Sequence, residues 1–136
     1  MISFAENKKA SEYSPLALAY IGDSVYEIYV RARVLAENPD KPAHKLHVEA
    51  VKYVKAHAQS NSMEKVAEML DEEETAVYKR GRNAKAATVP KNAVLADYRR
   101  ATGFEALVGY LFILQRYERL ELIMQTAYES ARDNSR

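Results

Sequence analysis

The chain has 136 residues, 48% of them hydrophobic and 29% charged, a balance typical of a globular domain that excludes a disordered chain. Cysteine is absent, so disulfides and thiolate metal sites are excluded and a reducing, cytoplasmic location is expected. No stretch approaches the roughly 18 apolar residues of a membrane span, and residues 1–13 lack the apolar core of a signal peptide. The formal net charge is +1, so a nucleic-acid partner would have to be held by a local basic patch.

Apolar residues recur at intervals of three and four along most of the chain, which contains only four glycines and four prolines. This spacing is typical of helices, and strand signals are absent. The sequence therefore predicts an all-α fold, with a single domain over 1–136 and an ordered core over about 14–131. The expected helices are, in chain order, 15–36, 43–60, 61–70, 71–81, 93–115 and 117–131.

The boundaries of the first helices follow from local signals. Ser14 followed by Pro15 is an N-cap with a proline in the first turn, which predicts a helix start. The Asn61-Ser62 pair is expected to break the second helix and to cap the third.

The fourth and fifth helices carry their own signals. Asp71 and Glu74 have the spacing of a capping box. Gly81 is expected to end the helix that this box begins, because glycine is the usual residue just beyond a helix C-terminus. Thr102-Gly103 is the expected place for a kink in the fifth helix.

Two acidic residues break the helical pattern. Asp23 is the only charged residue between positions 12 and 27, and Glu105 is the only one between positions 100 and 116. The run 103–114 is apolar nearly all round, which indicates a helix buried inside the fold or against a partner. A carboxylate there costs several kcal/mol unless a cation or hydrogen bonds compensate it. Poor helix formers also surround Asp23, and broken local rules are expected at functional sites.

Two interpretations of these acids remain open from the residues alone. In the ordinary one, each acid pairs with a basic side chain, for example Glu105 with Arg31. In the other, Asp23 and Glu105 hold a metal ion. Oxygen ligands without cysteine suit Mg²⁺, which takes one or two carboxylates and can support phosphodiester hydrolysis.

Two motifs around these acids resemble the ribonuclease III family. Residues 18–27 (LAYIGDSVYE) are similar to the signature helix of that family, whose core is LEFLGDAV. Residues 102–109 (TGFEALVG) are similar to its second acidic motif, DxFEALIG. The resemblance covers most of the chain, from about 14 to 131. It implies the helical endonuclease domain of that family.

The chain departs from the family pattern in a way that resembles the Mini-III branch. Ala19 stands where the family has Glu, and Thr102 where it has Asp, so Asp23 and Glu105 are the remaining acidic ligands. The chain also stops where a double-stranded-RNA-binding domain would begin. The number of Mg²⁺ ions per site stays open, since two carboxylates hold one ion more easily than two.

The resemblance implies a function. It predicts a Mg²⁺-dependent endoribonuclease that cuts double-stranded RNA as an antiparallel homodimer, with Asp23 and Glu105 as catalytic residues and metal ligands. The products would carry 5′-phosphate and 3′-hydroxyl ends, and the cellular substrate would be the precursor of large-subunit (23S) ribosomal RNA. The cleavage site and the need for a ribosomal protein partner stay open.

A basic segment is the candidate RNA-binding element. Between positions 75 and 96 there are five basic residues and no acid. Arg, Lys and an Asn amide suit the phosphates and 2′-hydroxyls of A-form RNA, and Gly81 would let the backbone approach a ligand. Alternatively, these charges form a solvated face at a helix C-terminus. The candidate RNA-binding residues are Lys79, Arg80, Arg82, Asn83, Lys85 and Lys91.

Two other classes of function compete with the nuclease. The loss of two acidic ligands favours a catalytically inactive RNA-binding or ribosome-associated module with the same fold. A purely structural helical dimerisation module is the third candidate, but it leaves the two lone acids unexplained.

Overall fold

The computed structural model describes residues 4, 8–86 and 88–134, and within these ranges the regular secondary structure is entirely helical. The expected all-α fold is therefore confirmed. The elements are, in chain order, η1 (Ala10–Glu12), α1 (Pro15–Glu37), α2 (Ala43–Val54), α3 (Ala56–Ala67), α4 (Glu72–Asn83), α5 (Leu95–Ile113) and α6 (Tyr117–Asn134). No helix in the described part of the chain is both long enough and apolar enough to cross a membrane.

The helix starts expected from capping residues are formed. Ser14 accepts a hydrogen bond at Oγ from the backbone N–H of Ala17 at 3.1 Å, and Pro15 is the first residue of α1. At the start of α4, Asp71 Oδ1 accepts from the Glu74 N–H at 2.8 Å, and Glu74 Oε1 accepts from the Asp71 N–H at 3.0 Å. These bonds satisfy backbone donors that a helix N-terminus would otherwise leave free.

The expected break at Asn61-Ser62 is wrong. The second and third helices separate at Lys55, which has extended backbone angles (φ −63, ψ 150), and α3 continues through positions 61 and 62. Ser62 is accommodated because its hydroxyl donates to the Ala127 carbonyl of α6 at 3.0 Å. Asn61 bonds the imidazole of His57 on the same helix at 3.2 Å. Tertiary partners therefore outweigh the weak helix propensity of both residues.

Gly81 and Gly103 both lie inside helices. The expected end of the fourth helix near Gly81 falls two residues short, since α4 runs to Asn83, and α5 continues through Gly103 from Leu95 to Ile113. A β-carbon at position 81 would lie 2.9 Å from the Gly103 Cα, and one at position 103 would lie 2.7 Å from the ring of Tyr78. Both glycines therefore allow α4 and α5 to pack closely.

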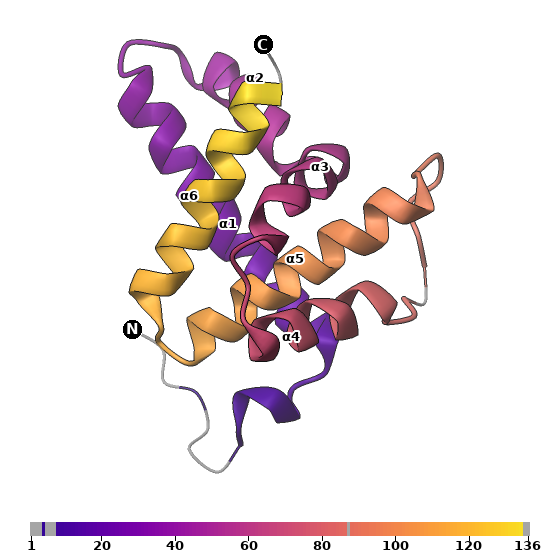
Figure 1. Cartoon of the computed structure of the whole chain (residues 1–136). Coiled ribbons are helices and arrows are strands. Elements are labelled where there is room, and N and C mark those ends of the chain that lie inside the picture. Colours follow the sequence, from indigo (N-terminus) through magenta and orange to yellow (C-terminus); the bar gives the residue numbers. More distant parts are fainter. Residues whose placement is uncertain (1–3, 5–7, 87, 135–136) are drawn as a thin grey trace.

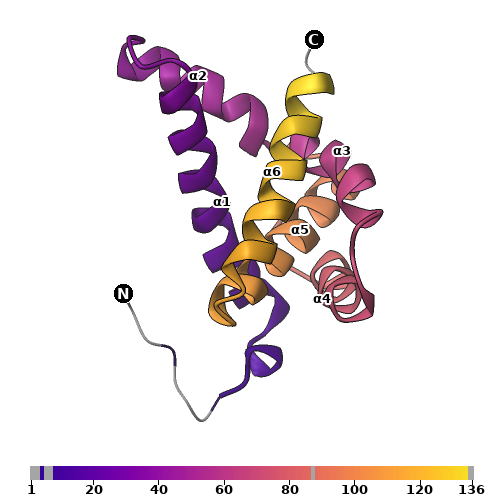
Figure 2. The same cartoon turned by 60° about the vertical axis from the view of Figure 1, so that its left-hand side comes forward.

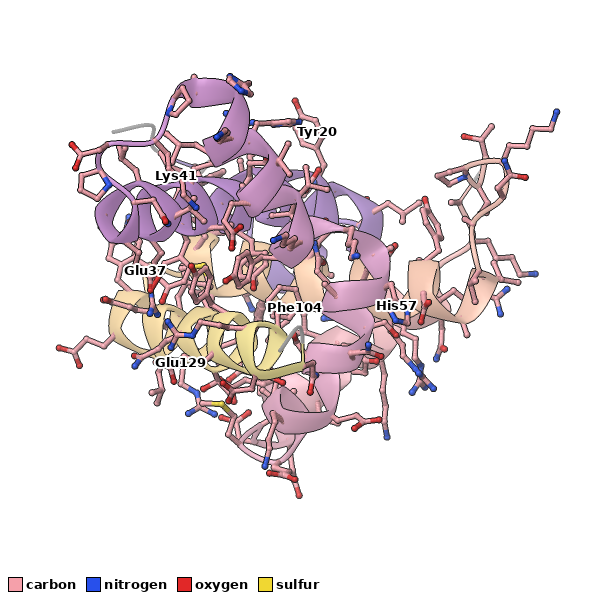
Figure 3. The ribbon with its side chains drawn as sticks, turned by 90° about the horizontal axis from the view of Figure 1, so that it is seen from above. Tyr20, Glu37, Lys41, His57, Phe104 and Glu129 are labelled. Carbon is pink, nitrogen blue, oxygen red and sulfur yellow. The ribbon has the colours of Figure 1, made fainter. Side chains whose placement is uncertain are left out.

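Helix α5 forms the centre of the fold. Phe104, Leu107 and Val108 are fully buried, and α1, α3, α4 and α6 all pack against this helix. Figure 1 shows α5 crossing the molecule between α4 and α6, and Figure 2 shows α2 crossing α1 near the end of α1 that is far from η1. In Figure 3 the ring of Phe104 lies among the helices, whereas Tyr20 of α1 lies at the outer surface. The apolar run 103–114 is thus buried within the chain.

Candidate functional site

Helices α1 and α5 make backbone contact beside the two acids. A β-carbon at Gly22 would lie 1.7 Å from the carbonyl oxygen of Glu105, and one at Gly109 would lie 2.0 Å from the carbonyl oxygen of Leu18. No side chain fits into either space, so glycine is the residue that this approach requires. The close contact explains a glycine in the middle of α1 and brings Asp23, the next residue, to Glu105.

Asp23 and Glu105 line one pocket of about 550 Å³. Asp23 is exposed and Glu105 is half-buried. The positions where the family has its other two acids, Ala19 and Thr102, line the same pocket. The hydroxyl of Thr102 donates to the Tyr98 carbonyl at 2.8 Å. The two motifs therefore meet in space, and two carboxylates remain where the family pattern has four.

The carboxyl of Glu105 is held in its protonated form up to unusually high pH. Its pKa is raised from 4.5 to about 8, first because burial disfavours the charged form, then by the negative charge of Asp23 and by a hydrogen bond with Asp23. The charge of Glu27 acts in the same direction, and a hydrogen bond with Gln59 acts against it. A positive charge bound beside this carboxyl would oppose both effects and favour its ionised form.

The ion pair proposed as the ordinary explanation for Glu105 is not formed. Arg31 instead contacts Glu27 one turn away on α1, at 3.0 Å. Among the described residues no salt bridge includes Glu105, and the charged groups that act most strongly on it, Asp23 and Glu27, are both acids. The buried carboxyl of α5 is therefore not explained by a protein cation.

The donor set suits a hydrated Mg²⁺ ion. Two carboxylates reach the pocket, and the described residues include no group of three or more His, Cys, Asp or Glu that could hold a metal. Mg²⁺ keeps several waters and is commonly bound through one or two carboxylates until substrate phosphate arrives. Asp23 and Glu105 would hold such an ion, and its charge would allow both carboxyl groups to ionise.

The basic segment divides over two faces of α4 and the loop that follows. Arg80 donates to the carbonyl of Ser11 in η1 at 3.5 Å, whereas Arg82 lies over the ring of Tyr78, with its guanidinium carbon 5.7 Å from the ring centre. Arg82 also donates to Asn83 Oδ1 at 3.2 Å. Lys79 is exposed on α4.

The α4–α5 loop connects the basic segment to the pocket. Ala86, Thr88 and Pro90 line the pocket, and the exposed residues Lys85 and Lys91 flank them in the chain. This loop extends from the body of the molecule in Figure 1. The role expected for Gly81, a close approach to a ligand, does not fit its burial against α5.

Two residues of this region were missed by the sequence interpretation. Gln59 of α3 lines the pocket together with Glu105 and acts on the charge of its carboxyl. Arg100 of α5 lies near Tyr78. Burial raises the pKa of this tyrosine, and the charges of Arg82 and Arg100 only partly oppose that effect. A neutral amide in a helix carries no sequence signal. The Arg99-Arg100 pair was a visible signal, three positions before the second acidic motif.

Comparison with known proteins supports the relationship suggested by the motifs. The Ribonuclease III domain family matches residues 16–116. A Mini-ribonuclease 3 from Clostridium tetani is 48% identical over 126 residues, covering 90% of this chain and 83% of the relative. A Mini-ribonuclease 3 from Thermoanaerobacter sp. is 43% identical over 135 residues, covering 95% of this chain and 94% of the relative.

A solved structure agrees with these matches. The crystal structure of a Fusobacterium nucleatum protein superposes with a TM-score of 0.78 at 30% sequence identity, covering 87% of this chain and 94% of that one. The family and the fold expected from the two motifs are therefore confirmed. This chain, with its single helical ribonuclease III domain, belongs to the ribonuclease III family, and its relatives within that family are the Mini-ribonucleases 3.

Proposed function

We propose that this endoribonuclease cuts double-stranded RNA at the pocket between α1 and α5, with Asp23 and Glu105 as catalytic residues and ligands of Mg²⁺. One observation carries the proposal: Asp23 and Glu105, the two lone acids of the apolar helix runs, line the same pocket. Members of this family act on duplex RNA, and the names of the relatives are those of ribonucleases.

The residues of the chain have distinct tasks in this proposal. Asp23, exposed at the pocket, would be the more accessible carboxylate ligand of a hydrated cation. Glu105, partly buried, would be the second carboxylate ligand. The chemistry that such a cation supplies is activation of water and stabilisation of the charge that develops on the phosphodiester. Lys79, Arg80, Arg82, Asn83, Lys85 and Lys91 bind the RNA backbone.

The finer parts of the proposal rest on the resemblance of the motifs. They are an antiparallel homodimer in the cytoplasm, with one pocket per protomer so that each cuts one strand, and the precursor of 23S ribosomal RNA as substrate. The products carry 5′-phosphate and 3′-hydroxyl ends. A two-fold pair of sites matches the opposite polarity of the two strands.

The test is cleavage of a long RNA duplex and of the same strand alone, with Mg²⁺ and with EDTA. Wild-type protein should cut only the duplex, and only with Mg²⁺. Asp23→Asn and Glu105→Gln should each lower the rate by more than about 10³, because each removes a charge that holds the cation. Glu121→Gln is the matched control, since this exposed acid lies on α6, away from the pocket. Near-normal turnover by either pocket variant would refute the assignment.

One observation favours a second candidate, an inactive RNA-binding or ribosome-associated module. Ala19 and Thr102 line the pocket at the places of two acidic ligands, so the remaining donor set is small. In the same experiment this candidate predicts that the duplex is not cut at any Mg²⁺ concentration.

A further inference from the structure

Gln59 is a buried amide at the pocket that contains Asp23 and Glu105. Its side chain is 2% exposed and belongs to the first turns of α3. Glutamine is usually an exposed residue, and an apolar side chain of similar length would fill the same space without any need for hydrogen-bond partners. The presence of an amide at this position therefore calls for a reason other than packing.

One side of the amide is anchored to the junction between α2 and α3. Gln59 Nε2 donates to the carbonyl oxygen of Val54 at 2.8 Å. Val54 is the last residue of α2, and the extended backbone of Lys55 separates it from α3. This bond fixes the side chain relative to both helices.

The other neighbour of the amide is Glu105, across the α3–α5 interface. Both residues line the pocket, and the amide lies close enough to act on the charge of the Glu105 carboxyl. The amide thus links the α2–α3 junction to the carboxyl that a cation would bind.

The same amide leaves one atom unsatisfied. Gln59 Oε1 is buried and has no hydrogen-bond partner among the described residues. A buried acceptor without a donor destabilises a fold, and a methionine or leucine at this position would avoid that cost. Such exceptions are expected where a residue serves the active site.

We propose that Gln59 is a positioning residue: anchored on Val54, it orients the carboxyl of Glu105 toward Asp23 so that the two carboxylates bind a divalent cation together. This inference rests on the proposed metal site at Asp23 and Glu105. It assigns to α3 a part in the active site that the two acidic motifs do not contain. Partners that orient a metal ligand commonly change metal affinity by about 10- to 100-fold when they are removed.

The test compares two changes at position 59 with a structural control. Gln59→Met keeps the length of the side chain and removes the amide. Gln59→Asn keeps the amide but is one methylene shorter, so that it cannot reach both Val54 and Glu105. Ser62→Ala is the control, because Ser62 is equally buried on the same helix and loses a hydrogen bond to α6, outside the pocket.

Three measurements are made on each folded protein. Binding of Mn²⁺ without RNA is followed by electron paramagnetic resonance, thermal stability by circular dichroism, and duplex-RNA cleavage by kcat and KM separately. We expect both Gln59 variants to bind Mn²⁺ about 10-fold or more weakly and to lose kcat by a similar factor, with KM unchanged. Ser62→Ala should lower the melting temperature and leave Mn²⁺ binding as in the wild type.

Other outcomes overturn the inference in distinguishable ways. If the Gln59 variants bind Mn²⁺ like the wild type, or lose no more affinity than Ser62→Ala, then Gln59 is only a structural residue. Asp23→Asn is measured in the same assay. If it loses Mn²⁺ while the Gln59 variants retain it, the metal site stands and only the role of Gln59 is wrong. If wild type and Asp23→Asn do not differ, the metal site itself is wrong and the inference is overturned with it.

Discussion

Gly22 on α1 lies so close to the carbonyl oxygen of Glu105 on α5 that a β-carbon at position 22 would stand 1.7 Å from that oxygen. The contact is between backbones, so no change of rotamer can relieve a larger side chain. Asp23 follows Gly22 directly, and Glu105 itself provides the second acid. The packing of two helices and the assembly of the proposed metal site therefore depend on the same contact.

The first prediction is that Gly22→Ala destabilises the protein and weakens its metal site. Alanine is the better helix former by about 1 kcal/mol. Separating α1 from α5 should cost more than this gain, since overpacking a core costs about 1–3 kcal/mol and a clash with backbone lies at the upper end. Urea unfolding measures the loss, and Mn²⁺ affinity measures the separation of the acids. Ser24→Ala, at an exposed position two residues away, should change stability by less than about 0.5 kcal/mol. Equal stabilities of the two variants would contradict the proposed contact.

The second prediction concerns pH and the metal-free protein. Glu105 has a pKa of about 8 in the fold, against 4.5 ordinarily. Between these values the unfolded chain releases the proton while the folded chain keeps it, so the folded state binds more protons and the free energy of unfolding falls as pH rises. Below about 4.5 this contribution is absent, and above about 8 the full loss is present.

Glu105→Gln removes this dependence. In EDTA the variant should gain stability over the wild type from pH 5 to pH 8, reaching roughly 2–4 kcal/mol after allowance for partial exposure, and the difference should level off above pH 8. Urea unfolding at five pH values measures it. Glu121→Gln, on the exposed face of α6, is the control and should follow the wild type. Parallel pH profiles for Glu105→Gln and the wild type would show that the carboxyl is not perturbed as stated.

The sequence was sufficient to single out the two acids and to predict the capped starts of α1 and α4, because both signals are local. A lone charge in an apolar run and a capping box can be recognised within about ten residues of chain. The break at Lys55 could not be predicted, since neither Gly nor Pro marks it and the competing Asn61-Ser62 signal is overridden by bonds to His57 and Ala127.

The glycines and the glutamine show a second limit. Gly81 near a helix end is equally compatible with a C-cap and with close packing, and only the position of Gly103 on a neighbouring helix distinguishes these roles. Gln59 has no charge and no motif around it. Its place at the pocket depends on how α3 packs on α5, which local patterns do not encode.

The third prediction is that the protein dimerises through α1. Tyr20, Ile28 and Leu35 lie along one exposed side of this helix with exposed fractions of 81%, 69% and 52%. The run 103–114 is buried inside the chain and cannot serve as the interface, so this side of α1 is the apolar surface next to the pocket that a second copy can cover. Tyr20 is labelled at the outer surface in Figure 3.

Ile28→Glu tests this interface. A buried charge opposite an apolar surface should convert the dimer to monomer at micromolar concentration, as measured by sedimentation velocity. Leu122→Glu is the control, because Leu122 is 47% exposed on α6, and this change should leave the dimer intact. A wild-type protein that sediments only as a monomer, or a dimer that survives Ile28→Glu, would count decisively against α1.

The last prediction concerns the basic segment of α4 and the α4–α5 loop. If Arg80, Arg82, Lys85 and Lys91 contact phosphates, replacing all of them with Ala should weaken binding to any duplex sequence alike. Counterion release requires each lost contact to lower the slope of log affinity against log salt by somewhat under one unit. The affinity is measured across a salt series in Ca²⁺, which suppresses cutting. Cleavage at saturating RNA should be retained, because the acids lie on other helices.

The structure makes this experiment more specific. Arg80 reaches toward Ser11, whereas Arg82 lies beside Tyr78 and near Arg100, so the two arginines face different sides of α4. Single changes of Arg80 and Arg82 therefore show which side of α4 faces the duplex. If the side with Arg82 faces it, Arg82→Ala and Arg100→Ala should both weaken binding. Lys41, Lys52 and Lys65, all exposed on other elements, are changed together as the control. The segment is a solvated face, and RNA binds elsewhere, if the basic-segment variant keeps its duplex affinity and salt slope. The same conclusion follows if its affinity falls by no more per removed charge than that of the control.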